Sequence, residues 1–401
     1  MKPLGDSPRQ PLSGTDELAR LLRNGFDVRG RSVAVLVDNA VRDTVIHQRV
    51  TAALEGAHSE TFVLSGPGDL RGVCTLSGRL ADAELVVGLG GGSLLDQAKL
   101  ATLMASGPEL SARLTVPQRS GLIVLAPAPS RPMPLIAVPT TVGTGSESSA
   151  VACLAYPQGK RLVMGRVLRP EAAVLAPEAT VTLPQELVAE GVLEALFRLV
   201  SPYVGDHHDL PPQDARVEAA AGRLVRLGYG VREAARAGER SSDRLRREIA
   251  ELSGSSHGES FHEGRDPYAV KGWLIANELS TVLAIRKMTA VAALLPVLWR
   301  AIDAGERRLG SARRLRRLWS LLRSEGPERL PADPASGVAA LIDSWLIERR
   351  IAMTPSQTET AARRIVRAWG AGLPMLGGLD GDDLLRLLRE AAEPLPEPFV
   401  A

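Results

Sequence analysis

Two short stretches of the chain carry the residue types that could bind a phosphorylated ligand. In "VVGLGGGSLLDQAKL" an apolar run breaks into Gly90, Gly91 and Gly92, followed by Ser93 and a helical pattern. Glycines let the backbone approach a ligand without a Cβ in the way. The first N–H groups of a helix opened by Ser93 would point into the turn and favour a phosphate there. The same glycines also suit a tight strand-to-helix turn that binds nothing.

The second stretch is "PLIAVPTTVGTGSESSAVA", which follows another strand pattern. Its hydroxyl side chains, Thr140, Thr141, Thr144 and Ser146, surround flexible glycines. Hydroxyl groups at the carboxyl end of a strand suit hydrogen bonds to a ribose, a phosphate or a nicotinamide amide. The alternative is a polar loop that uses Ser and Thr only to make turns. Two such loops after two strands of one sheet favour a bound dinucleotide.

Asp38 ends a third strand pattern, "SVAVLVD". A carboxylate at this position can accept hydrogen bonds from a ribose 2′-hydroxyl and would repel a 2′-phosphate. If the ligand is a dinucleotide, Asp38 therefore favours NAD over NADP. An aspartate that merely begins a turn is the alternative.

The composition limits the class of protein. With 401 residues the chain is long enough for two domains. Its 48 basic and 46 acidic residues give a net charge of +2, which provides no reason to expect nucleic acid or an anionic membrane as partner. Two cysteines cannot form a disulfide framework, and neither a signal peptide nor a membrane span is visible. We expect a cytoplasmic protein.

Strand and helix patterns alternate over roughly the first 180 residues, which predicts a parallel α/β sheet. From Pro184 onward the patterns are long and helical. We therefore expect an α/β dinucleotide-binding domain over residues 1–182 and an all-helical domain over residues 183–401. Within the second, residues 254–267 are expected to form a polar loop and the basic stretch 307–319 a solvated helix face. The predicted strands are residues 32–38, 84–90, 121–127 and 134–140.

The motifs "GGGSLLDQAK" (Gly90–Lys99) and "PTTVGTGSE" (Pro139–Glu147) resemble those of the iron-containing (group III) alcohol dehydrogenases. That superfamily includes glycerol dehydrogenase and the dehydroquinate synthases. The resemblance continues to about residue 302 and implies a homodimer that binds NAD(P) and substrate between its two domains. It also implies that the glycine turn and Ser93 contact the cofactor pyrophosphate and that the hydroxyl loop binds the cofactor. Asp96 extends the glycine motif, and Lys160 matches a lysine near the nicotinamide ribose.

The resemblance fails at the metal site. Family members of this type generally hold iron or zinc with one aspartate and three histidines. This chain has Glu194, Arg198, Trp273 and Lys287 at those positions, and Asn277 at that of a further histidine. Arginine donates no lone pair and tryptophan offers only an N–H. One carboxylate cannot hold iron or zinc, so we expect no metal.

Two interpretations of this replacement remain open. Arg198 and Lys287, balanced by Glu194, could hydrogen-bond a substrate alkoxide or carboxylate in place of the metal. Alternatively, Glu194 and Arg198 form an ordinary helical ion pair in a filled relic of the site. The cluster "HGESFHE" (residues 257–263) has plausible ligand spacing for a metal, but a polar loop explains it as well.

The sequence supports two functional hypotheses. The first is a metal-independent, NAD(P)-dependent oxidoreductase with Glu194, Arg198 and Lys287 as catalytic residues, acting on a small-molecule or peptide substrate. A narrower version is a tailoring enzyme of specialised metabolism, for example one that oxidises a C-terminal threonine in a ribosomal peptide. The second is a catalytically inactive or partner-dependent scaffold that binds the cofactor and assembles with another enzyme.

Overall fold

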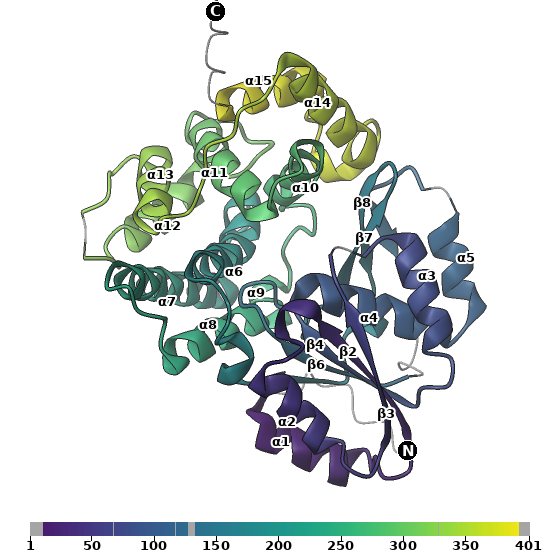
Figure 1. Ribbon diagram of the computed structural model, residues 1–401. Coiled ribbons are helices and arrows are strands. Elements are labelled where there is room, and N and C mark those ends of the chain that lie inside the picture. Colours follow the sequence, from purple (N-terminus) through teal and green to yellow (C-terminus); the bar gives the residue numbers. More distant parts are fainter. Residues whose placement is uncertain (1–10, 67, 117, 127–132, 328, 393–401) are drawn as a thin grey trace, which may run out of the picture. The chain divides into compact units, whose positions relative to one another are not determined.

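The β-branched runs near the start of the chain form a parallel sheet, seen in the lower right part of Figure 1. The computed structural model describes residues 11–392 apart from 67, 117, 127–132 and 328. It divides into two units. The first comprises residues 1–118, 122–191 and 241–257, and the second comprises residues 119–121, 192–240 and 258–401.

The main sheet of the first unit has the strand order β1-β9-β6-β4-β2-β3, and all neighbouring strands run parallel. Helices cover both faces: α1 and α2 pack on one, α3 and α4 on the other. Burial on both faces explains why β2 and β4 are almost entirely apolar. The strands are β1 (Leu12–Ser13), β2 (Ser32–Asp38), β3 (His58–Leu64), β4 (Leu85–Gly90), β6 (Leu135–Pro139) and β9 (Ala172–Leu175).

A smaller sheet has the order β5-β8-β7, in which β7 and β8 are antiparallel. Its strands are β5 (Leu122–Val124), β7 (Val151–Tyr156) and β8 (Gly159–Met164). The run predicted as a strand over residues 121–127 is strand only at β5, and it pairs with β8 rather than joining the main sheet. Part of the predicted run, residue 127, lies outside the described residues.

The helices of the first unit include one that comes late in the sequence. They are α1 (Thr15–Arg20), η1 (Leu21–Gly25), η2 (Asn39–Val41), α2 (Val45–Ala53), α3 (Leu70–Arg79), α4 (Gly92–Ala105), α5 (Pro108–Thr115), η3 (Arg166–Leu168), η4 (Pro177–Thr180) and α8 (Asp243–Ser255). Buried Arg246 of α8 donates to Thr180 Oγ1 at 3.0 Å and to the carbonyl oxygen of Pro177 at 3.3 Å. These bonds attach α8 to the α/β unit, whereas the sequence had assigned it to the helical domain.

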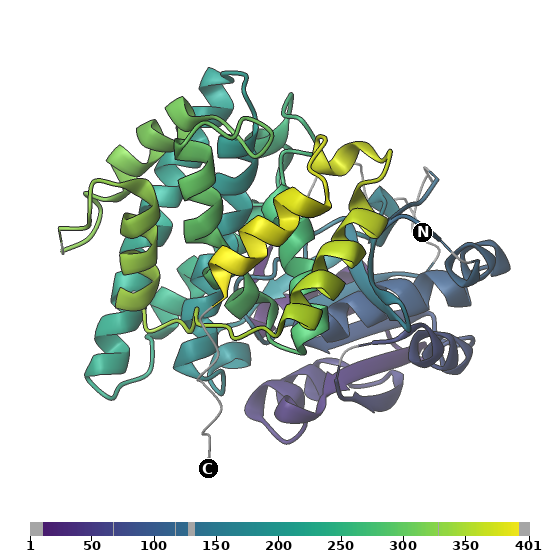
Figure 2. The same cartoon turned by 90° about the horizontal axis from the view of Figure 1, so that it is seen from above.

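The second unit is built from helices (Figure 2). Helix α6 (Gln185–Gly205) begins in the first unit and continues into the second. The others are α7 (Pro211–Arg236), α9 (Glu259–His262), α10 (Lys271–Leu283), α11 (Lys287–Asp303), α12 (Ala312–Leu322), α13 (Pro334–Ser344), α14 (Pro355–Trp369), η5 (Pro374–Leu376) and α15 (Gly381–Ala391). The predicted fold class, a parallel α/β unit followed by a largely helical part, is confirmed.

A buried charged network lies inside this helical unit. Arg314 of α12 is 1% exposed and donates to Asp214 through both Nη atoms, at 2.9 and 2.7 Å. Arg265 donates to the same carboxylate at 2.7 Å. The guanidinium of Arg314 also lies 4.1 Å from the Tyr203 ring centroid. The expectation of a solvated face over residues 307–319 is therefore wrong for Arg314.

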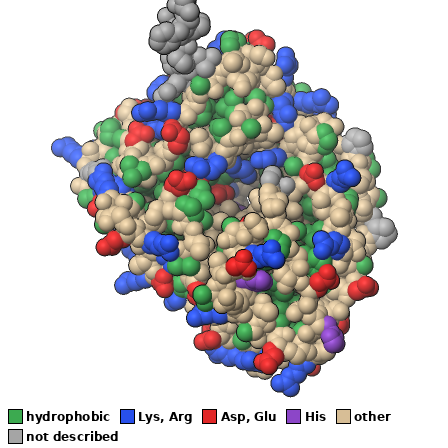
Figure 3. All heavy atoms as spheres, viewed as in Figure 1, with side chains coloured by type: hydrophobic (Ala, Val, Ile, Leu, Met, Phe, Trp, Pro, Cys, Tyr) green, Lys and Arg blue, Asp and Glu red, His purple; other side chains and the backbone are tan. Residues whose placement is uncertain are grey.

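Charged side chains of both signs occur on the face of the molecule drawn in Figure 3. On this face, basic and acidic side chains are interspersed, in keeping with the near-equal numbers of each in the sequence. None of the helices that the structure describes is both long enough and apolar enough to cross a membrane.

Candidate cofactor and substrate sites

The structure brings the glycine turn and the hydroxyl loop together at the carboxyl ends of β4 and β6. The backbone N–H of Thr140 donates to the carbonyl oxygen of Gly90 at 3.0 Å. A Cβ added at Gly91 would lie 3.0 Å from Thr141 Cγ2, and one added at Gly92 would lie 2.9 Å from Thr144 Cγ2. Both glycines have negative φ, so their role is close approach rather than an unusual backbone conformation.

This turn has the properties of an anion cradle. Helix α4 begins at Gly92 with Gly91 as its N-cap, and no side chain caps it. Its first N–H groups therefore face the turn with the positive end of the helix dipole. Beside them, the hydroxyl of Thr141 is buried and has no hydrogen-bond partner among the described residues. A cradle that a Cβ would fill, an uncapped helix and an orphaned hydroxyl together fit a dinucleotide phosphate.

Asp38 lies at the same edge of the sheet. Pairing of Val37 with Leu89 sets it next to Gly90 of β4. One carboxylate oxygen of Asp38 accepts a hydrogen bond from the N–H of Ala40 at 2.9 Å and so caps the short helix η2. The interpretation of Asp38 as the start of a turn is therefore confirmed, and its contact with a ribose stays a prediction.

Asp96 and Ser146 contact each other and hold the hydroxyl loop in place. Ser146 Oγ donates to Asp96 Oδ1 at 2.6 Å, and Asp96 Oδ2 accepts from the N–H of Cys153 at 2.9 Å. Fully buried Lys99 lies 3.6 Å from Asp96 and donates to the carbonyl oxygen of Val151 at 2.9 Å. These side chains position the loop that carries Thr141 and Thr144. Lys160 lies half-buried on β8, in the smaller sheet.

His257 is a contact of the hydroxyl loop that the sequence had placed in a polar loop. Helix α8 extends to Ser255, and the His257 Nε2 lies 3.0 Å from the carbonyl oxygen of Thr144. The ring also fills the space over Gly145, where φ is +61° and a Cβ would collide with it. Nothing in the local spacing of "SGSSHG" predicts this contact, because its partner is more than a hundred residues away.

In the helical unit, three of the four family metal positions come together. Arg198 Nη2 lies 3.3 Å from Glu194 Oε1, and their side chains are only 12% and 18% exposed. The Arg198 guanidinium lies 6.0 Å from the ring centroid of Trp273, at the limit of a cation–π contact. The Phe197 ring packs on the same indole, with 4.7 Å between centroids. This part of α6 and α10 therefore forms a cationic, aromatic group.

Asn277, at the further histidine position, lies one turn after Trp273 and is 2% exposed. Its Nδ2 donates to Glu278 Oε1 at 3.2 Å, while its Oδ1 is buried without a hydrogen-bond partner in the described part of the chain. Lys287 is half-buried and begins α11, where no side chain caps the helix.

These residues do not fit the metal that the family implies. Glu194 is the one anionic donor at the four positions, and it is paired with a guanidinium that cannot ligate. Within the described ranges, no group of three or more His, Cys, Asp or Glu side chains could hold a metal ion.

Residues 8–177 match the family described as iron-containing alcohol dehydrogenase. Over these residues the chain is similar to the iron-containing alcohol dehydrogenases. Among solved structures, it resembles the NADH-dependent butanol dehydrogenase A of Thermotoga maritima (TM-score 0.78, 16% identity, 97% of this chain and 98% of that one). It also resembles the iron-containing alcohol dehydrogenase of Thermococcus thioreducens (TM-score 0.74, 18% identity, 96% and 98% of the chains). At such identities the likeness shows the fold.

Sequence relatives are similar over a limited region. Phosphonoacetaldehyde reductase of Streptomyces viridochromogenes is 34% identical over 190 residues, 46% of this chain and 48% of that protein. The mitochondrial hydroxyacid-oxoacid transhydrogenase of Caenorhabditis briggsae is 29% identical over 211 residues, 49% of this chain and 44% of that protein. The chain thus spans less than half the length of these relatives.

Proposed function

We propose that this protein is a NAD(P)-dependent oxidoreductase that interconverts a hydroxyl and a carbonyl group without the metal that names its family. The observation that carries the proposal is the Glu194–Arg198 pair. Its cation is largely buried at a position where the resemblance implies a metal ligand, and the turn at Gly91 and Gly92 has features that fit a dinucleotide. The relatives' names, a reductase and a transhydrogenase, support this class of reaction.

The chain's own groups would act in two places. The turn at Gly91 and Gly92 and the N-terminus of α4 bind the cofactor diphosphate, and the orphaned Thr141 hydroxyl supplies a further hydrogen bond. NAD(P), when bound, supplies the hydride donor or acceptor. Arg198 donates hydrogen bonds to the substrate oxygen and stabilises the negative charge that develops on it, as the family's metal ion would. Glu194 holds the guanidinium in a fixed orientation.

An arginine at this position also favours one class of substrate. A guanidinium can bind a carboxylate through two parallel hydrogen bonds. A metal ion that binds a substrate alkoxide does not need a carboxylate on the substrate. We therefore propose a hydroxy acid or its oxo form as substrate, either a small molecule or the C-terminus of a peptide. Oxidation of a β-hydroxy acid such as a C-terminal threonine would give a β-keto acid. That product loses carbon dioxide readily, so the second step needs no metal.

The proposal is tested with chelator-treated protein. We expect NADH or NADPH fluorescence to change on binding, and we expect turnover with members of a panel of hydroxy acids, oxo acids, alcohols and aldehydes. Binding without any turnover would favour the partner-dependent scaffold. Absence of binding to either nucleotide would overturn the proposed function.

A further inference from the structure

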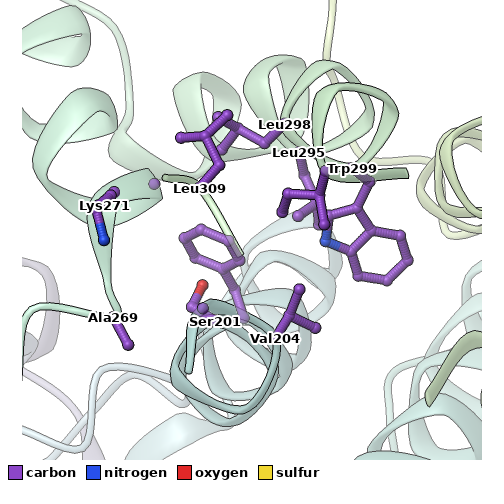
Figure 4. Close-up of a pocket in the computed structure, with 12 residues that line it drawn as sticks. Ser201, Val204, Ala269, Lys271, Leu295, Leu298, Trp299 and Leu309 are labelled. Atoms are coloured by element: carbon purple, nitrogen blue, oxygen red, sulfur yellow. The ribbon is translucent and has the colours of Figure 1, made fainter. Parts of the chain in front are cut away.

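A pocket in the helical unit shares only Phe197 with the candidate sites described above. It is lined by α6, α10 and α11 together with the segments at Ala269 and Leu309, and its empty volume, open mouth included, is about 350 Å³. Figure 4 shows Leu295, Leu298 and Trp299 along one wall and Val204 on another. The lining is apolar except for two side chains, Ser201 and Lys271. In apolar pockets a few polar groups fix the orientation of a bound small molecule, and here Ser201 and Lys271 could do so.

Lys271 is an unusual residue for such a pocket. Its side chain is 8% exposed, and its Nζ donates to the carbonyl oxygen of Tyr268 at 3.3 Å. Among the described residues, no carboxylate lies within 4.0 Å of that ammonium, although Asp266 acts on it from farther away. Burial lowers the pKa of Lys271, because a charged amine is poorly solvated there. A buried cation is normally paired with an anion, which offsets the cost of removing the cation from water. The Lys271 ammonium has no such anion within 4.0 Å among the described residues.

The backbone around Lys271 points to an anion as well. Lys271 is the first residue of α10, and its N-cap, Val270, has no side chain that caps the helix. A cation at this end is disfavoured by the helix dipole, whereas an anion is favoured. Gly272, the next residue, lines the pocket, and a Cβ there would lie 2.8 Å from Phe197 Cζ. An anion in the pocket could therefore meet both the ammonium and the first turn of α10.

The position of Lys271 is also well defined. Its aliphatic stem lies against Gly377, where a Cβ would come 2.8 Å from Lys271 Cε. The backbone φ at Gly377 is +59°, a conformation that residues with a side chain rarely adopt. A side chain at this position is therefore disfavoured by the backbone conformation as well as by the contact with Lys271. The Nζ atom lies 3.4 Å from the same Cβ position, so the end of the side chain is held in the pocket wall next to the turn after η5.

We infer that this pocket binds a small carboxylic acid with an apolar tail. Its carboxylate pairs with Lys271 and accepts hydrogen bonds from Ser201 and the α10 N-terminus, and its tail packs on Leu295, Leu298 and Trp299. Phe197 lines this pocket and also packs on Trp273, the neighbour of Arg198. The site is nevertheless separate from the proposed reaction, because its ligand needs neither nucleotide nor Arg198.

The test is calorimetric titration of the full chain, without nucleotide, with hexanoate, hexanol and hexylamine. We expect hexanoate to bind and the other two to bind at least tenfold more weakly. Affinity should rise from acetate through butanoate to hexanoate by roughly fourfold per CH₂ if the tail is buried. Inorganic phosphate, which has no tail, should bind no better than acetate.

Variants test whether Lys271, rather than another basic residue, binds the carboxylate. Lys271→Met should weaken hexanoate binding at least tenfold, whereas Lys271→Arg should stay within a few-fold of the unmodified protein. Arg389→Met, which removes one exposed charge from the same unit, is the matched control and should change nothing. Circular dichroism and Tm establish that each variant is folded. Ser201→Ala is a second variant and should weaken hexanoate binding less than Lys271→Met does. Equal hexanoate affinity in Lys271→Met and the unmodified protein, or no binding to either, would overturn the inference.

Discussion

Arg198 and Glu194 form a largely buried ion pair, with 3.3 Å between Nη2 and Oε1, one helical turn apart on α6. In the family that this chain resembles, those two positions carry ligands of a divalent metal. The Arg198 guanidinium lies 6.0 Å from the ring centroid of Trp273, which the resemblance assigns to a third such position. A solvated ion pair would contribute only a few tenths of a kcal/mol. Burial beside an aromatic ring makes this one a candidate for chemistry.

Changing this pair should affect turnover and leave nucleotide binding intact. Arg198→Lys keeps the positive charge but loses the planar guanidinium with its parallel N–H donors. The double variant Arg198→Gln with Glu194→Gln removes both charges, so that neither charge is left unpaired. We expect the double variant to lower kcat by about 10² to 10³, the range for loss of a donor to a developing oxyanion. Steady-state kinetics measure this, with NADH fluorescence titration in parallel.

The matched control for that variant is the more exposed pair Arg316 and Asp303, whose side chains are 62% and 26% exposed and whose atoms lie 2.6 Å apart in the same unit. Arg316→Gln with Asp303→Asn should leave kcat unchanged. If the Glu194 and Arg198 variants were as active as this control, the pair would be a relic of the site.

Gly92→Ala should weaken cofactor binding, because the new Cβ would meet Thr144 Cγ2 at 2.9 Å and crowd the start of α4. We expect NADH affinity to fall at least tenfold. Thr144→Ser in the same chain removes the methyl group and should restore part of the loss. Gly78→Ala, on α3 with nothing within 4 Å of its Cβ, is the control and should bind NADH normally. Equal affinity of Gly92→Ala and Gly78→Ala would count against the cradle.

Asp214 should make stability depend on pH in the acid range. Burial alone would raise the pKa of Asp214, but hydrogen bonds from Arg314 and Arg265 lower it from 3.8 to about 2. Because the folded-state pKa lies below the unfolded one, the stabilisation is complete above about pH 4 and is lost as the pH falls towards 2. Its size is about 2 kcal/mol. Urea unfolding at a series of pH values measures it.

Asp214→Asn should lower the free energy of unfolding at pH 7 by about 3 to 5 kcal/mol, since it leaves buried Arg265 without its carboxylate and Arg314 with only the exposed Asp209. The difference from the unmodified protein should narrow below pH 4. Asp382→Asn, which changes an exposed carboxylate in the first turn of α15, should shift stability little at any pH. A pH-independent difference for Asp214→Asn would contradict the assigned pKa.

The sequence predicted the parts of the fold that local pattern determines. Strands β2, β4 and β6 are short β-branched runs buried on both faces, and α4 follows directly from the glycine turn. Strand β3 was missed because it lies at the edge of the sheet and its residues are mostly exposed, so it lacks the apolar run that marks a central strand.

Residues whose role depends on distant partners could not be predicted in the same way. Arg246 looks like a surface residue of an amphipathic helix, yet its bonds to Thr180 and Pro177 attach α8 to the sheet unit. His257 reaches Thr144 across 113 positions. The sequence did indicate Asp96 and Ser146 through their motifs, but not that they bond to each other and support the loop.

We propose that a guanidinium group takes the place of the metal in a protein that binds a dinucleotide. One preparation tests both halves: protein purified without chelator is analysed for metals by mass spectrometry and titrated with NADH and NADPH. We predict iron and zinc far below one per chain, together with saturable binding of one nucleotide. Stoichiometric iron or zinc, with nucleotide binding that disappears when the metal is removed, would contradict the claim.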